Sequence, residues 1–174
     1  FPAFPTNVQA TYALINGEVD WAGNFIPAID RIFVDKNPEN HHYWFPRAGG
    51  SIFLYPNTTK KHLDNKAFRK AISYSIDREL IAKVAMYDYT VPAHITALSE
   101  GMSRWRENKK RKENWNILNR DKAISILDSL KYSFSNNKAL YDNNEITFEI
   151  IVVSGWSDWI RAAQIISRNL KDIG

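Results

Sequence analysis

The stretch from Glu145 to Asp172 constrains the fold of this chain most, because it carries two hydrophobic patterns in succession. Residues 145–153 alternate between polar and apolar and then become fully apolar, which predicts a half-buried strand that enters a core. A Ser-Gly-Trp-Ser-Asp turn follows at 154–158, and Ser157 is a suitable N-cap for a helix through Asp172. A strand that leads directly into an amphipathic helix predicts an α/β fold.

The rest of the chain continues this mixture of helical and extended patterns. Further strands are expected at 18–22 and 51–55, and loops at 36–50, 87–118 and 132–144. The strands are few for 174 residues, which indicates a piece of a larger mixed sheet with flanking helices. Further helices are expected at 6–16, 24–35, 65–74, 77–86 and 119–130, with N-caps at Asn65 or Asp64, at Asp77 and at Asn119.

Composition excludes several classes of protein. The chain has no Cys, so it has no disulfides, no thiolate metal site and no cysteine nucleophile. No apolar run approaches the roughly 18–20 residues of a membrane span, and the net charge of +4 permits acidic partners without requiring them. The chain starts at Phe1 with no targeting signal, and it stops at Gly174, a helix C-cap, so we expect a piece cut at an element boundary.

Catalytic and cofactor motifs are weak. His41 and His42 form the only histidine cluster. Glu39 is nearby, but no other His lies close in sequence, so we expect no metal site. The segment 154–157 lacks the Gly-x-Ser-x-Gly pattern of a nucleophile elbow, and no phosphate-binding glycine loop is present, so we expect no cofactor. A hydrolase would have to use dispersed carboxylates, of which the candidates are Asp20, Asp30, Asp35 and Asp64.

A basic run at 104–113 contains one aromatic residue, Trp105. Lysines and arginines could contact phosphates there while Trp105 stacks on a base, which keeps a small nucleic-acid-binding domain as an alternative. The run is short and includes Glu107 and Glu113, so a solvated surface loop is favoured. We therefore expect no nucleic-acid partner.

Aromatic and amide side chains gather where the predicted strands end. Ligands of α/β sheets bind at the carboxyl ends of strands. There, Trp and Tyr offer flat faces with polar edges, and Asn and Asp offer directed hydrogen bonds. Such a set suits hydroxyl-rich rings or an extended peptide. The predicted ligand-binding residues are Trp21, Asn24, Phe25, Trp44, Tyr55, Asn57, Trp156, Asp158 and Trp159.

Several segments, in order, resemble the extracytoplasmic solute-binding proteins of ABC importers, in the oligopeptide- and dipeptide-binding family five. The most specific is Phe68-Arg-Lys-Ala-Ile-Ser-Tyr-Ser-Ile-Asp-Arg-Glu-Leu-Ile81. The others are Leu14-Ile-Asn-Gly-Glu-Val-Asp20, Tyr55-Pro-Asn-Thr-Thr59, Tyr89-Thr-Val-Pro-Ala93, Asp121-Lys-Ala123 and Leu170-Lys-Asp-Ile-Gly174. The resemblance implies a fragment of a two-lobed periplasmic-binding-protein type II fold. Residues 1–48 would end the first lobe and form the hinge crossover, and residues 49–174 would begin the second lobe.

The resemblance also implies a function. It indicates a non-enzymatic receptor, a monomer outside the membrane, either a cell-surface lipoprotein or periplasmic, which delivers oligopeptides to an ABC permease by lobe closure. This chain departs from the family pattern at Tyr87-Asp88-Tyr89, where a glycine is usual. The segments 20–25 and 155–159 look more like the branch that binds oligosaccharides of the cello or manno type, since Trp stacks on sugar faces. Peptide and sugar therefore both stay open as ligands.

Overall fold

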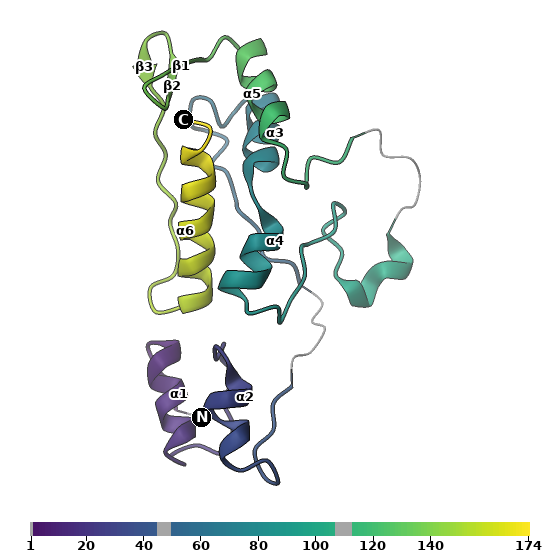
Figure 1. Cartoon of the computed structure of the whole chain (residues 1–174), viewed down its shortest axis with the longest axis vertical. Coiled ribbons are helices and arrows are strands. Elements are labelled where there is room, and N and C mark those ends of the chain that lie inside the picture. The colour runs from purple at the N-terminus through teal and green to yellow at the C-terminus, as the bar shows by residue number, and fades with distance from the viewer. Residues whose placement is uncertain (1, 45–49, 107–112) are drawn as a thin grey trace.

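The computed structural model describes residues 2–44, 50–106 and 113–174, which form two parts (Figure 1). The smaller part, at the bottom of Figure 1, contains α1 (Asn7–Ile15), the short α2 (Ile29–Ile32) and the 3-10 turn η1 (Val34–Lys36). Leu14, Ile26 and Ile29 form its own small core. The larger part contains every other element and lies above it.

The larger part is built around α3 (Lys66–Ser75) packed on α5 (Arg120–Ser129). Ala71 of α3 and Ala123 of α5 are both fully buried, and these small side chains let the two helices approach closely. The core that they share also contains Phe68, Tyr74, Leu127, Tyr132 and Ile173.

Side-chain caps fix where these helices begin. Asn65 Oδ1 accepts the backbone N–H of Ala67 at 2.8 Å, and Asn119 Oδ1 accepts that of Lys122 at 2.9 Å. Asp77 in the same way accepts the N–H of Leu80 and starts α4 (Arg78–Leu80). The predicted N-caps at Asn65, Asp77 and Asn119 are confirmed. Such caps are each worth about 1 kcal/mol.

The predicted helix at 77–86 contains a change of helical type. After α4 the chain continues as the π-helical turn η2 (Ile81–Ala85), which packs against α6 (Ser157–Lys171). α6 begins at Ser157 as a first helical residue with Trp156 as its N-cap, so the predicted capping role of Ser157 is wrong. The predicted helix at 24–35 is shorter than expected, because Ala28 has a φ of +51° and a helix begins only at Ile29.

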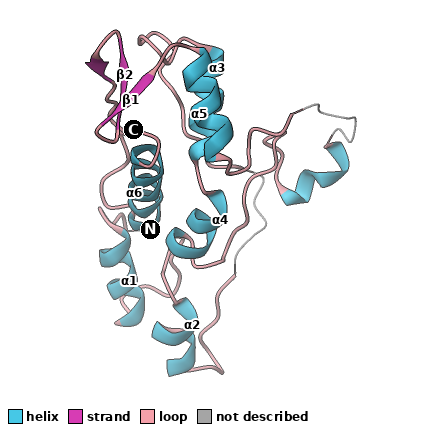
Figure 2. Cartoon of the chain, turned by 45° about the horizontal axis from the view of Figure 1, so that its top comes forward, coloured by secondary structure: helices cyan, strands magenta, loops and turns pink. Residues whose placement is uncertain are grey.

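The sheet is small and lies where a loop was predicted. β1 (Ser133–Ser135), β2 (Lys138–Tyr141) and β3 (Asn144–Glu145) pair antiparallel at one end of the molecule (Figure 2). Both connecting turns consist of two consecutive residues with positive φ, Asn136–Asn137 and Asp142–Asn143. That backbone matches type I′ hairpin turns, for which Asn and Asp are favoured. The prediction of a loop at 132–144 is therefore wrong.

The three predicted strands do not form ladders with one another. Among the described residues, 18–22 and 51–55 pair with nothing, and only Glu145 of the predicted strand 145–153 belongs to a sheet. A strand requires a neighbour to accept its backbone hydrogen bonds. The apolar side chains of these segments divide between the cores and the surface. Val19 and Ala22 pack on the small N-terminal core and Ile146 on the larger one, whereas Ile151 is 93% exposed. The helices together with the small antiparallel sheet nevertheless fit the predicted α/β class.

No helix in the described part of the chain combines the length and apolarity that crossing a bilayer requires.

His62 carries a pH dependence of folding. It forms a hydrogen bond with the hydroxyl of Tyr132, and burial lowers the pKa of its imidazole below 6.5. The unfolded chain therefore binds a proton near pH 6.5 that the folded chain resists, so stability falls as the pH falls below that value. We expect the free energy of unfolding, measured with urea from pH 7.5 to 5.5, to fall less steeply in His62→Gln than in the wild type. Identical slopes would contradict this account of His62.

Candidate functional site

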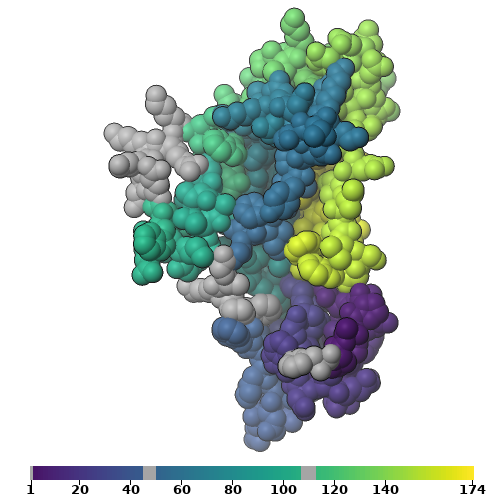
Figure 3. Space-filling view, turned by 180° about the vertical axis from the view of Figure 1, so that it is seen from behind, coloured from purple at the N-terminus to yellow at the C-terminus, as the bar shows by residue number. Residues whose placement is uncertain are grey.

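A hollow of about 410 Å³ lies where the N-terminal segment meets the start of α6. The space-filling view from behind shows this junction between the purple N-terminal residues and the yellow-green residues before α6 (Figure 3). The hollow brings together six of the nine predicted ligand-binding residues, which are Trp21, Asn24, Phe25, Trp156, Asp158 and Trp159. Residues that the sequence did not single out also line it, among them Pro2, Phe4, Thr6, Asn7, Ala10 and Val19.

Gly155 sets the distance between the two walls. Its carbonyl accepts the backbone N–H of Asn7, at the start of α1, at 3.1 Å. Gly155 has a φ of +84°, and a Cβ there would lie 2.7 Å from the carbonyl oxygen of Pro5. Only glycine satisfies both conditions without strain. The turn at 154–156 therefore seats the first turn of α6 directly on the N-terminal segment.

Two asparagines organise the polar part of the hollow. Asn7 Nδ2 donates to Ser157 Oγ and to Asp158 Oδ1, both at 3.4 Å, and Asp158 is only 7% exposed. Asn24 Nδ2 donates to the carbonyl of Asn7 at 3.2 Å and to Thr11 Oγ1 at 3.3 Å. Asn24 Oδ1 is buried and has no hydrogen-bond partner in the described part of the chain. Because this oxygen is buried, a donor on a ligand could satisfy it only if the walls of the hollow move apart.

The four predicted aromatic side chains that line the hollow differ in how much of each ring is accessible to a ligand. The rings of Trp156 and Trp159 pack edge to face, with centroids 4.6 Å apart, so each fixes the other. Trp21 is 72% exposed, and its indole lies over Gly23, where a Cβ would be 2.8 Å from the ring. Phe25 is half-buried and packs against Tyr87 and Tyr89. Trp21 therefore offers the most open ring face of the four.

The electrostatics of the hollow are simple. Among the described residues that line it, Asp158 is the only charged side chain, and no Lys, Arg or His is present. An anionic group of a ligand would find no cation here. The hollow can stack flat apolar faces and exchange directed hydrogen bonds with neutral groups or with a cation.

Three predicted residues lie outside the hollow. Trp44 and Tyr55 are 80% and 82% exposed, and the ring of Tyr55 packs on that of Phe53. Asn57 closes a local turn, in which its Oδ1 accepts the N–H of Thr59 at 3.0 Å. Their part in ligand binding remains a prediction. Asn7 was missed because the sequence offers no sign that it would meet α6.

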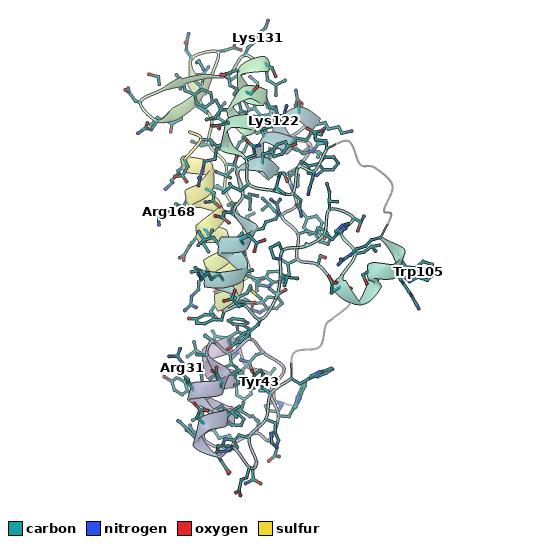
Figure 4. All side chains as sticks on the ribbon, turned by 45° about the vertical axis from the view of Figure 1, so that its right-hand side comes forward. Arg31, Tyr43, Trp105, Lys122, Lys131 and Arg168 are labelled. Carbon is teal, nitrogen blue, oxygen red and sulfur yellow. The ribbon has the colours of Figure 1, made fainter. Side chains whose placement is uncertain are left out.

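The structure gives little support to the two alternative sites, a metal site at the histidine pair and a nucleic-acid site at the basic run. In the residues that the structure describes, no group of three or more His, Asp or Glu side chains could hold a metal ion. His41 stacks on Phe33 and bonds its carbonyl at 2.7 Å. Most of the basic run, residues 107–112, lies outside the described residues. Of the rest, Arg106 pairs with Glu100. Trp105 ends η3 (Glu100–Trp105; Figure 4) and is not among the residues that line the hollow.

Comparison with known proteins identifies the chain's relatives. The family model described as bacterial extracellular solute-binding proteins, family 5 Middle, matches residues 1–174. The oligopeptide-binding protein OppA of Bacillus subtilis is 35% identical over 98 residues, which are 54% of this chain and 17% of that protein.

Two solved structures share the fold. The mannohexaose-bound periplasmic oligopeptide-binding protein of Thermotoga maritima superposes on 99% of this chain with a TM-score of 0.83 and 23% identity. A second structure of that protein gives a TM-score of 0.77 over the whole chain with 24% identity. The chain spans about a third of the length of those solved chains, 33% and 34%. These superpositions confirm the expected periplasmic-binding-protein fold.

Proposed function

The chain belongs to the bacterial extracellular solute-binding proteins of family 5, and we propose that it is part of an ABC-importer receptor that captures oligopeptides outside the membrane and delivers them to the permease. The observation that supports this most is the hollow itself. It lies between two separately packed parts of the chain and gathers six side chains suited to holding a ligand. The naming of the Bacillus subtilis relative as an oligopeptide-binding protein supports peptide as the ligand class.

The two packed parts suggest how capture would work. We assign residues 1–48 to the end of a first lobe with its hinge crossover and residues 49–174 to the start of a second lobe. A ligand that touches both walls of the hollow stabilises the closed arrangement over the open one, and this difference drives closure. The permease would then recognise the closed receptor. The receptor acts as a monomer held outside the membrane, as a lipoprotein or in the periplasm, and it needs no enzymatic activity or cofactor.

Oligosaccharides are the second candidate ligand. The hollow has exposed indole faces and an unsatisfied amide acceptor, and it lacks a cation for a peptide carboxylate. Sugar rings stack on indoles and donate hydroxyl hydrogen bonds, so they match this set. The Thermotoga maritima protein of the same fold holds mannohexaose, which keeps a manno-type oligosaccharide in consideration.

Calorimetric titration of the complete protein that contains this chain tests the proposal. Alanine peptides of three to five residues, mannohexaose and a single-stranded RNA at low salt are the three probes. Saturable binding of the peptides, or of mannohexaose as the second candidate, with no RNA binding, is the expected result. Binding of RNA alone would contradict the transport proposal and favour a nucleic-acid-binding function. Binding of none of the three probes would also contradict the transport proposal.

A further inference from the structure

Tyr87 holds an unfavourable backbone conformation beside the hollow. It follows the π-helical turn η2 and has a φ of +52°, and Asp88 after it has a φ of +59°. Left-handed backbone is costly for a residue with a Cβ, and a large aromatic there is rare. Strain of this kind persists only where the surrounding contacts hold it, and it concentrates at functional sites. The contacts of the Tyr87 side chain therefore indicate why this strained backbone conformation is kept.

The side chain of Tyr87 connects the two walls of the hollow. Arg161 of α6 donates from Nη1 to the Tyr87 hydroxyl at 2.8 Å, and its guanidinium lies 5.4 Å from the centre of the ring. The Tyr87 ring in turn packs on Phe25, with centroids 6.2 Å apart. Phe25 belongs to one wall of the hollow, and Arg161 stands one turn after Asp158 in the other. Tyr87 itself is not among the lining residues.

Phe25 is held from a second side by Tyr89. The two ring centroids lie 6.0 Å apart, and the Tyr89 hydroxyl accepts the backbone N–H of Ile29 at 3.2 Å. Tyr89 also packs against the small core of the N-terminal part. The segment 87–89 thus joins the larger part of the molecule to the wall that carries Phe25.

We propose that Tyr87 and Arg161 are positioning residues, which fix the ring of Phe25 in the wall of the hollow and couple it to the first turns of α6. The inference rests on the proposed function for its effect on ligand binding, but the placement of Phe25 can be tested without a ligand. The strained backbone at Tyr87 is maintained because it aims the ring at Phe25 and the hydroxyl at Arg161.

Asp88 provides a matched control. It is exposed and has the same left-handed backbone, but it makes no ring contact and no side-chain hydrogen bond in the described part of the chain. Asp88→Gly and Tyr87→Gly both relieve backbone strain, and only Tyr87→Gly removes a ring. Tyr87→Phe keeps the ring and loses the hydroxyl, and Arg161→Met removes the donor without touching the strained backbone.

The first measurement is the ¹⁹F NMR signal of 4-fluorophenylalanine placed at position 25 of the complete protein. We expect Tyr87→Gly to shift and broaden this signal, Tyr87→Phe and Arg161→Met to shift it less, and Asp88→Gly to leave it unchanged. An unchanged signal in both Tyr87→Gly and Arg161→Met would overturn the proposal. Equal effects of Asp88→Gly and Tyr87→Gly would also overturn it, because strain alone would then be responsible.

The second measurement is the Kd for whichever probe the wild type binds, tetraalanine or mannohexaose. We expect Tyr87→Gly to weaken binding about 3- to 10-fold and to have no further effect in a Phe25→Ala background, since the two residues act as one unit. Asp88→Gly is expected to leave the Kd within about twofold. Full additivity of Tyr87→Gly and Phe25→Ala would overturn the proposal. If neither probe binds, the proposed function fails, and the fluorine signal still decides the positioning role.

Discussion

Removing the indole of Trp21 is expected to weaken ligand binding about 10- to 100-fold, which corresponds to roughly 1.4–2.8 kcal/mol. Trp21 presents an exposed ring face at the hollow and lies over Gly23, where the absence of a side chain leaves room for the indole. The measurement is the calorimetric Kd of Trp21→Ala in the complete protein. The truncation leaves the backbone of the hollow untouched, so the loss should appear in affinity and hardly in stability.

Trp105→Ala is the matched control for this prediction. Trp105 is 68% exposed, close to the 72% of Trp21, but it lies on η3 outside the hollow. Its removal is expected to leave the Kd within about twofold. Equal losses in the two variants, or no loss in Trp21→Ala, would show that the hollow is not where the ligand binds.

Replacing Gly155 with alanine is expected to lower the free energy of unfolding by about 2–5 kcal/mol. Left-handed backbone contributes roughly 1–2 kcal/mol of this loss, and the forced displacement of a packed neighbour contributes about 1–3 kcal/mol. The displaced neighbours are Pro5 and Thr6, so the loss falls on the contact between the N-terminal segment and α6. Urea denaturation followed by circular dichroism measures the change.

Gly17 separates the two contributions. It has a φ of +73°, similar to the +84° of Gly155, but a Cβ there would meet nothing within 4 Å. Gly17→Ala is therefore expected to cost only about 1–2 kcal/mol, the backbone contribution alone. If Gly155→Ala costs no more than Gly17→Ala, the close seating of α6 on Pro5 and Thr6 does not hold the hollow together.

Local sequence signals predicted where several helices begin. The strands were predicted less well, because strand pairing depends on contacts between segments far apart in the sequence. Asn65, Asp77 and Asn119 begin helices because a capping side chain needs only its own next three residues. The predicted strands at 18–22 and 51–55 required partners that the sequence could not name. The hairpin at 133–145 was missed although Asn136–Asn137 carries its turn signal.

The sequence predicted several residues of the candidate site, but it did not predict why they lie together. Trp21, Asn24, Phe25, Trp156, Asp158 and Trp159 were chosen because they follow predicted strands, and the structure gathers them in one hollow. Those strands, however, are unpaired. The residues meet because the turn at Gly155 docks on the start of α1, a contact between distant segments. Tyr55 and Asn57, which end a predicted strand, and Trp44, which precedes one, lie elsewhere.

A crystal structure of the complete protein with its ligand bound would test the central claim most directly, which is that the hollow between the N-terminal segment and the start of α6 belongs to the binding site. The account predicts ligand atoms in van der Waals contact with the indole of Trp21 and a ligand donor within hydrogen-bond distance of Asn24 Oδ1. A ligand bound elsewhere, with Trp21 exposed and Asn24 Oδ1 still unpaired, would contradict it.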